Sequence, residues 1–179
     1  MFEEASLRTP PQLETSRLLL RGWRGRDLKA HAEMAADPEV MRYIGDGDTL
    51  DRARSWREIA LHIGHWALRG YGQWALERKD DGASLGQAGL WNPPGWPGLE
   101  VGWRLARHAW GQGYATEAGQ AAIDWAWDTL DADQLISVIQ PGNSRSIRVA
   151  ERLGMRRLRE TTLKGQGVVI FGIDRPGAR

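Results

Sequence analysis

The stretch WGQGYATEAGQAA, at residues 110–122, contains the residues best suited to hold an anion. Gly111 and Gly113 lack a Cβ atom, so the backbone can turn sharply and a ligand can reach its N–H groups. A helix that begins near Tyr114 leaves its first N–H groups without internal partners, and its dipole adds partial positive charge there. The pattern predicts a phosphate-binding turn, although a glycine pair before a helix is also an ordinary turn.

Two common phosphate-binding motifs do not match this stretch. A P-loop requires a glycine, four residues and then Gly-Lys-Ser/Thr, which the sequence lacks. The dinucleotide-binding motif requires a third glycine at position 116, where this chain has Thr116. The glycine pair alone therefore leaves a nucleotide-binding module as one alternative.

The remaining sequence alternates between strand-like and helix-like segments. Strands are predicted at residues 16–23, 72–79, 84–91, 99–106 and 134–140, followed by a final pair around 165–167. Helices are predicted at residues 27–44, 50–70, about 114–130 and 143–154, with a break in the first near Asp37-Pro38. This order predicts a single α/β (α+β) domain over residues 1–179, with a loose lead-in at residues 1–15. Its mixed, mostly antiparallel sheet would have about six or seven strands, with helices on both faces.

The composition excludes several kinds of site. The chain has 179 residues and no cysteine, so disulfides, thiolate metal sites and cysteine nucleophiles are excluded. With 24 basic and 23 acidic residues, its net charge is +1, which gives no support for a nucleic-acid or membrane-surface partner. The N-terminal segment lacks the apolar core of a secretory signal, and no apolar run could span a bilayer, so we expect a cytoplasmic protein.

A longer pattern gives the glycine pair a context. A strand with one carboxylate, LEVGWRLA, is followed by HAWGQGYATEA, then by a buried strand and NSRSIRVAERLGM. This arrangement resembles the GNAT superfamily of acyl-CoA-dependent N-acyltransferases, and most of all the branch that acetylates the N-termini of ribosomal proteins. The resemblance runs from ETSRLLLRGW to the last strand. It implies an enzyme that uses acetyl-CoA, acetylates a small-molecule amine or a peptide N-terminus, needs no metal and is compatible with a homodimer.

The resemblance also implies where the coenzyme lies. The pyrophosphate of acetyl-CoA would rest on the backbone amides of residues 111–115, and residues 103–105 would hold the pantetheine arm by backbone hydrogen bonds. The 99–106 strand would carry a bulge and splay from the 134–140 strand, which leaves a V-shaped slot. The coenzyme-binding residues implied in this way are Trp103, Arg104, Leu105, Trp110, Gly111, Gln112, Gly113, Tyr114, Ala115, Thr116, Asn143 and Arg152.

Glu100 and Ser146 are the candidate catalytic residues. Glu100 is the candidate base, directly or through a water, if burial raises the pKa of its carboxyl group. Its alternative is a solvated strand residue paired with Arg104. The ribosomal-protein branch usually has a serine at the position of Ser146, which implies a donor to the leaving thiolate; otherwise Ser146 is an ordinary first-turn serine. The main-chain N–H of Trp103 or Leu105 is the candidate oxyanion donor.

The chain departs from the superfamily pattern at two positions. His108 stands where Arg or Gln is frequent, and a contact made by the backbone would tolerate this change. Ala150 stands where a tyrosine often lies near the thioester sulfur, so no phenol is available there as a general acid.

The acceptor site is the least determined part of the sequence. The resemblance implies that it lies between Met41–Asp48 and Leu163–Val168. The candidate walls are Trp91 and Trp96. Asp46 and Asp48 would attract a cationic amine, or they are simply turn formers.

Other polar clusters admit plain explanations. His62 and His65 lie three residues apart on a predicted helix, but two ligands without a third do not predict a metal site. Arg145, Arg148 and Arg152 form a basic helical stripe; we interpret Arg145 as part of a solvated face and leave Arg152 open to the coenzyme. A non-catalytic acyl-CoA-binding sensor on the same scaffold is the alternative function.

Overall fold

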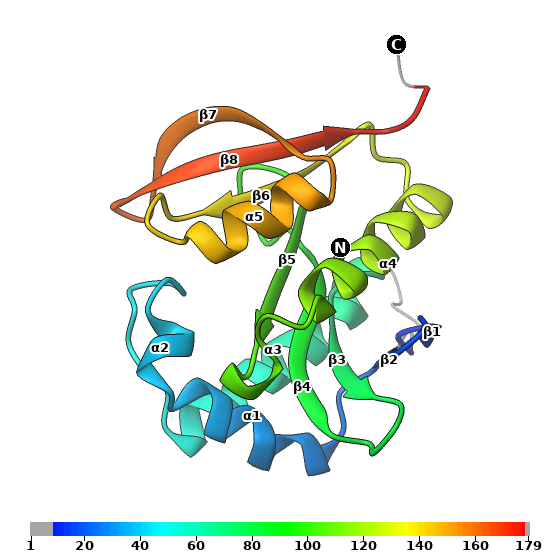
Figure 1. Ribbon diagram of the computed structural model, residues 1–179, viewed down its shortest axis with the longest axis vertical. Coiled ribbons are helices and arrows are strands. Elements are labelled where there is room, and N and C mark those ends of the chain that lie inside the picture. The colour runs from blue at the N-terminus through cyan, green and yellow to red at the C-terminus, as the bar shows by residue number, and fades with distance from the viewer. Residues whose placement is uncertain (1–8, 178–179) are drawn as a thin grey trace.

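The computed structural model describes residues 9–177, and an eight-stranded sheet runs through this range (Figure 1). The strands are β1 (Leu13–Glu14), β2 (Leu18–Arg21), β3 (Gln73–Arg78), β4 (Ser84–Trp91), β5 (Glu100–Leu105), β6 (Gln134–Ile139), β7 (Arg156–Leu163) and β8 (Gln166–Asp174). The helices are α1 (Leu28–Ala35), α2 (Pro38–Met41), α3 (Arg52–Arg69), α4 (Tyr114–Thr129) and α5 (Ser144–Arg152). The strand order is β1-β2-β3-β4-β5-β6-β8-β7. Neighbouring strands are antiparallel except β5 and β6, which are parallel.

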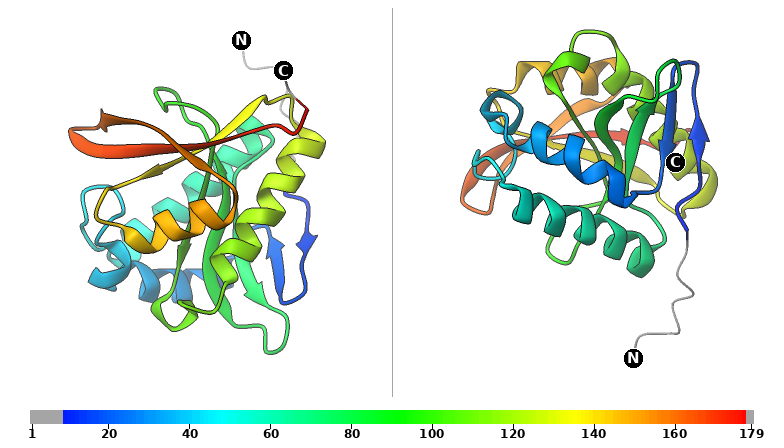
Figure 2. Two further views of the ribbon diagram at one scale, coloured as in Figure 1. Left: turned by 45° about the horizontal axis from the view of Figure 1, so that its top comes forward. Right: turned by 90° about the horizontal axis from the view of Figure 1, so that it is seen from below.

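Helices cover both faces of the sheet, as Figure 2 shows. Two adjacent residues of β5 demonstrate this. Arg104 donates to Glu58 of α3, whereas the Trp103 ring lies 3.6 Å from the position of an added Cβ at Gly119 of α4. Because successive side chains of a strand point to opposite faces, α3 and α4 lie on opposite sides of β5. The predicted mixed α/β architecture is confirmed. No helix within residues 9–177 combines the length and apolarity needed to cross a membrane.

The sheet has one strand more than the upper end of the predicted range. Leu13 pairs with Leu20 of β2, and the turn between them is closed by the Leu18 N–H, which donates to Thr15 Oγ1 at 3.0 Å. The predicted loose lead-in is therefore wrong for the segment that forms β1. A two-residue strand is too short to show the alternation of side chains by which strands are recognised.

Local capping sets the helix boundaries. Asp37 accepts a hydrogen bond from the Glu39 N–H, and Pro38 is the first residue of α2. Because a residue before proline disfavours the helical conformation, the chain breaks between α1 and α2, as predicted. Asp51 caps the start of α3, and Gly70 ends it in the left-handed conformation. The break leaves α2 as a separate short helix beside the open side of β5.

β5 is paired very differently on its two edges. With β4 its pairing is continuous over six residue pairs, so the bulge predicted in residues 99–106 is not found. Gly86 of β4 permits this close approach, because at φ +133° a Cβ atom there would lie 2.2 Å from the Arg104 carbonyl oxygen. With β6, β5 pairs at one position, Glu100 opposite Ile136, and the two strands then part. The strands splay as predicted, and they do so without a bulge.

Candidate functional site

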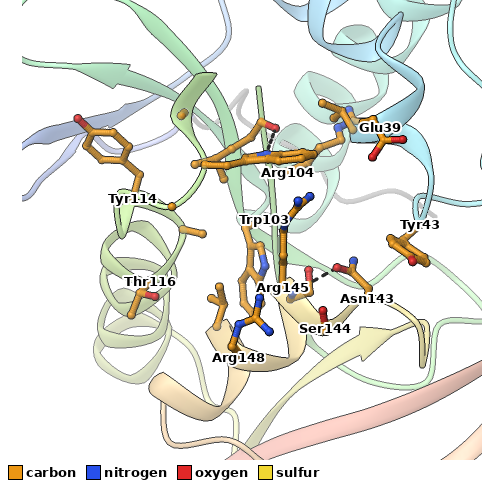
Figure 3. A pocket seen from close by; sticks show the side chains of 18 of the residues that line it. Glu39, Tyr43, Trp103, Arg104, Tyr114, Thr116, Asn143, Ser144, Arg145 and Arg148 are labelled. Carbon is orange, nitrogen blue, oxygen red and sulfur yellow. Dashed lines mark hydrogen bonds between the residues drawn. The ribbon is translucent and has the colours of Figure 1, made fainter. Parts of the chain in front are cut away.

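A cavity of about 640 Å³ lies beside β5, between the first turns of α4 and α5 and the short helix α2 (Figure 3). Most of the residues predicted from sequence line it. They are Trp103, Arg104, Leu105, Trp110, Gly111, Gly113, Tyr114, Ala115, Thr116, Asn143, Ser146 and Arg152. Glu100 and Gln112 lie outside the lining.

One end of the cavity offers main-chain donors. Gly111 and Gly113 are exposed and have φ angles of +75° and +84°, which glycine adopts without strain. Gly113 precedes α4 with no side-chain cap within the described residues, and the Glu117 N–H makes the bond to the Gly113 carbonyl oxygen. The N–H groups before Glu117 therefore lack helical partners. The buried Thr116 Oγ1 also has no partner in the described part of the chain. This end suits a phosphate group.

A second set of main-chain groups faces the gap between β5 and β6. Just after β5, the Ala106 N–H donates to the Leu85 carbonyl oxygen of β4, whereas the Leu99 carbonyl oxygen, just before β5, accepts from the Ile136 N–H of β6. Because main-chain groups alternate in direction along a strand, those of Trp103 and Leu105 point toward β6. Trp110 Nε1 donates to the Leu105 carbonyl oxygen at 2.8 Å. The main-chain groups of Trp103 and the Leu105 N–H have no partner within residues 9–177, so they can pair with an extended ligand.

Where β5 and β6 part, side-chain hydrogen bonds replace the main-chain hydrogen bonds of the strand pair. The Val138 N–H of β6 donates to Glu100 Oε1 at 3.2 Å. The Ser137 hydroxyl donates to the Val101 carbonyl oxygen at 2.6 Å. Both main-chain groups are thereby satisfied without strand pairing, and the Glu100 carboxyl group lies at the closed end of the gap.

The Glu100 carboxyl group has the properties of a proton acceptor. Burial raises its pKa to about 7, and the hydrogen bonds from the Val138 N–H and from Trp96 Nε1 offset part of that rise. Trp96 Nε1 lies 2.7 Å from Oε2. Arg104 pairs instead with Glu58 of α3, at 2.6 Å, so the alternative of a solvated Glu100–Arg104 pair is wrong.

Asn143 and Ser146 begin α5. Asn143 Oδ1 accepts a hydrogen bond from the Ser146 N–H at 3.2 Å, which caps the helix as predicted. The cap uses the main-chain N–H of Ser146 and leaves its hydroxyl free of that bond, and the residue is part of the cavity lining. Ser146 is therefore placed where its hydroxyl can face a bound ligand.

Comparison with known proteins identifies the family. Residues 17–156 match the acetyltransferase (GNAT) domain. The chain belongs to the GNAT acetyltransferase family. YkkB, an uncharacterized protein of Bacillus subtilis, is 34% identical over 149 residues, which are 80% of this chain and 84% of that protein. The structure of an acetyltransferase from Agrobacterium tumefaciens is 30% identical with a TM-score of 0.82, and the match covers 96% of this chain and 98% of that one.

More distant structures share the fold. RimL, a ribosomal-protein α-N-acetyltransferase solved in complex with coenzyme A, is 15% identical with a TM-score of 0.76, over 92% of this chain and 98% of that one. Family membership makes this chain an acetyl-CoA-dependent acetyltransferase. At 15% identity, RimL shows the fold alone and does not decide the acceptor.

The cavity of this acetyltransferase is strongly basic. Its lining contains one acidic residue, Glu39, and five arginines. Two of these arginines are Arg104, which Glu58 neutralises, and Arg145, whose guanidinium lies 4.4 Å from the centroid of the Trp110 ring. Arg145 is exposed, as predicted, and it additionally contacts the Trp110 ring and lines the cavity. The excess of positive charge suits the phosphates of coenzyme A.

The Gln112 side chain does not enter the cavity, because it donates to the His108 carbonyl oxygen at 2.8 Å. Its predicted contact with the coenzyme is by the main-chain N–H and stays a prediction.

Two parts of the site were missed or only loosely placed by sequence. Arg148 lines the cavity although its stripe looks like an ordinary solvated face. Glu39 and Tyr43 form a wall on the side of α2, as Figure 3 shows. The sequence indicated this wall only indirectly, because Met41–Asp48 was assigned to the acceptor site.

The two segments assigned to the acceptor meet at the end of β6. Gln140 Nε2 donates to the Gly45 carbonyl oxygen at 3.1 Å and to Gln166 Oε1 at 2.6 Å. Asp46 Oδ1 accepts from the Asp48 N–H at 3.2 Å, so Asp46 acts as a turn former. The loop after α2 and the β7–β8 hairpin therefore lie together near the gap.

The histidine pair has structural partners. Burial lowers the pKa of His62 to about 3, and Gln87 Nε2 lies 3.1 Å from His62 Nε2. His65 Nδ1 lies 2.8 Å from the Tyr71 carbonyl oxygen, and burial lowers its pKa. Both rings are neutral at pH 7 and bonded to different neighbours. Within residues 9–177, no three potential metal ligands lie together.

We predict that Glu100 makes stability fall as pH rises. Its folded-state pKa of about 7 lies above the ordinary value of 4.5, so the folded chain binds this proton more tightly than the unfolded chain. The resulting stabilisation is complete below pH 4.5 and is lost as pH rises to about 7. Urea unfolding from pH 4 to 8 should therefore give wild type a steeper decline than Glu100→Gln.

Glu33→Gln, at an exposed position of α1, controls for the loss of a carboxylate. Its pH dependence should follow that of wild type. Parallel curves for wild type and Glu100→Gln would contradict the raised pKa.

Proposed function

We propose that this acetyltransferase moves the acetyl group of acetyl-CoA directly to a primary amine, which belongs to a peptide N-terminus or to a small molecule. One observation carries the proposal: main-chain donors at the start of α4 and the edge of β5 at residues 103–105, which has no strand partner in the described part of the chain, line the same cavity. The first set suits a pyrophosphate, and the second suits an extended, amide-containing arm such as pantetheine.

The two sets define a direction for the bound molecule. The pyrophosphate is assigned to the N–H groups of Gly113, Ala115 and Thr116, with the Thr116 hydroxyl as a further donor. The pantetheine arm follows Trp103 and Leu105 toward the closed end of the gap. This direction brings the thioester toward the end where the Glu100 carboxyl group lies.

Few groups are needed for the transfer. The amine nitrogen attacks the thioester carbonyl carbon, a C–N bond forms, and the C–S bond breaks. Glu100, directly or through a water, accepts the proton that the amine loses. The main-chain N–H of Trp103 or Leu105 stabilises the developing oxyanion, and the Ser146 hydroxyl donates to the thiolate as it leaves. Positioning of the two reactants supplies much of the acceleration.

The acceptor is assigned to the junction of the loop after α2 with the β7–β8 hairpin. Trp96 lies there beside Glu100, and the Lys164 ammonium is 5.5 Å from the centroid of its ring. A peptide N-terminus and a small-molecule acceptor both present a primary amine, so an experiment must decide between them.

An acetyl-CoA turnover screen tests the proposal. Release of free thiol is followed with peptides, amino acids, polyamines and aminoglycosides as acceptors. We expect one class to be acetylated, and we expect acetyl-CoA to raise the melting temperature because it binds the folded chain. Stabilisation by acetyl-CoA without turnover of any amine would instead support the acyl-CoA-binding sensor. Displacement of CoA by ATP or NAD would support a nucleotide-binding module.

With an acceptor in hand, Glu100→Gln should lower kcat by roughly 10²–10⁴, because an amide cannot take the proton. Wild-type activity should rise with pH through about 7 as the carboxyl group loses its proton and becomes a base. The variant should lack that rise. Glu33→Gln serves again as the control and should keep both the rate and the pH profile. A Glu100→Gln variant with wild-type kcat would remove Glu100 from the mechanism.

A further inference from the structure

A turn far from the glycine pair in sequence is anchored beside it. The turn is Thr15-Ser16-Arg17, between β1 and β2, and its anchor is the Glu117 carboxylate in the first turn of α4. Glu117 Oε1 accepts from Thr15 Oγ1 at 2.5 Å, from Ser16 Oγ at 3.1 Å and from the Arg17 N–H at 2.9 Å. Burial raises the pKa of Glu117, but these donors outweigh it and hold the pKa below the ordinary value. The anchor is therefore an ionised carboxylate.

The Arg17 guanidinium extends from this anchor to the glycine turn. Its Nε donates to Glu117 Oε2 at 2.7 Å, and its Nη1 donates to the Gln112 carbonyl oxygen at 2.9 Å. Its Cζ lies 4.4 Å from the centroid of the Tyr114 ring. Its Nη2 lies 3.4 Å from the position of an added Cβ at Gly113. One side chain thus contacts Gln112 and Tyr114 and lies next to Gly113. In Figure 3 the Tyr114 ring points away from the other labelled side chains.

These contacts set the direction of one peptide group. The C=O and N–H of a trans peptide point in opposite directions, so a Gln112 carbonyl held toward Arg17 turns the Gly113 N–H to the other side. We assign the cavity to that side, because Gly113 lines it and Arg17, on the carbonyl side, does not. With glycine on both sides of Gln112, little in the turn itself prevents this peptide from flipping. A flipped carbonyl oxygen would face the coenzyme phosphates and repel them.

We infer that Arg17 is a positioning residue for the pyrophosphate of the coenzyme, and that it acts by locking the Gln112–Gly113 peptide with its N–H toward the cavity. The inference rests on the proposed function, because it takes acetyl-CoA as the ligand of this turn. Arg17 is absent from the cavity lining, so it acts through the peptide and not by touching the phosphate. If removal of the lock left about a tenth of the molecules correctly oriented, the apparent Kd for CoA would rise about tenfold.

Isothermal titration with CoA tests the lock. Arg17→Met removes the guanidinium, while the Thr15 hydroxyl and the main-chain N–H of residue 17 still hold Glu117, so the turn should remain in place. Lys79→Met is the matched control. Lys79 Nζ donates to Glu14 and to the Thr15 carbonyl oxygen, and so holds the same segment without reaching the glycine turn. We expect the Kd to rise about tenfold for Arg17→Met and less than about twofold for Lys79→Met.

Arg17→Lys separates geometry from charge. An ammonium keeps the charge but lacks the planar fork that joins Gln112 to Glu117, so most of the loss should remain. Wild-type affinity in either Arg17→Met or Arg17→Lys would overturn the inference, and so would equal losses in Arg17→Met and Lys79→Met. If Arg17→Met failed to fold, Arg17→Lys against Lys79→Met would decide. Failure of the wild-type chain to bind CoA at millimolar concentration would refute the proposed function instead.

Discussion

The gap between β5 and β6 depends on how a few hydrogen bonds are replaced where these strands part. A parallel pair would continue its ladder beyond Glu100 and Ile136. Here the Glu100 carboxyl group accepts from the Val138 N–H, and the Ser137 hydroxyl donates to the Val101 carbonyl. Because buried main-chain groups must be paired, these two side chains let the strands separate without leaving such groups unsatisfied. The next main-chain groups of β5 are then free to pair with a ligand.

The same arrangement supports the proposed role of Glu100 as a base. Its position at the closed end of the gap helps to keep the strands apart, and the burial that this position requires raises its pKa to about 7. A carboxyl group with that pKa is poised to take a proton near neutral pH. The separation of the strands and the raised pKa of the proposed base thus have one structural origin. Trp96, which donates to Glu100 from the loop before β5, connects this origin to the acceptor side.

Sequence predicted those parts of the site that depend on short-range chemistry. The glycine pair, the start of α4 and the Asn143 cap of α5 are local features, and the structure places each as expected. Contacts between distant segments were not accessible, because no local pattern encodes them. Arg17 and Gln112 lie 95 residues apart, and Arg104 finds Glu58 on α3 instead of its neighbour Glu100. The predicted bulge in β5 is not found. The Ser137 and Glu100 side chains bond the main-chain groups where the strands part, so the strands separate without an extra residue.

Main-chain donors beside the glycine pair and along β5 are proposed to hold the coenzyme. Because side-chain mutation cannot delete such donors, the most direct measurement is an amide ¹H–¹⁵N NMR titration of the labelled protein with CoA. We expect saturable shifts at Gly111, Gly113, Ala115, Trp103 and Leu105, with β7 unaffected. Saturable CoA binding that leaves these amides unchanged, or that shifts a different region, would contradict this proposal.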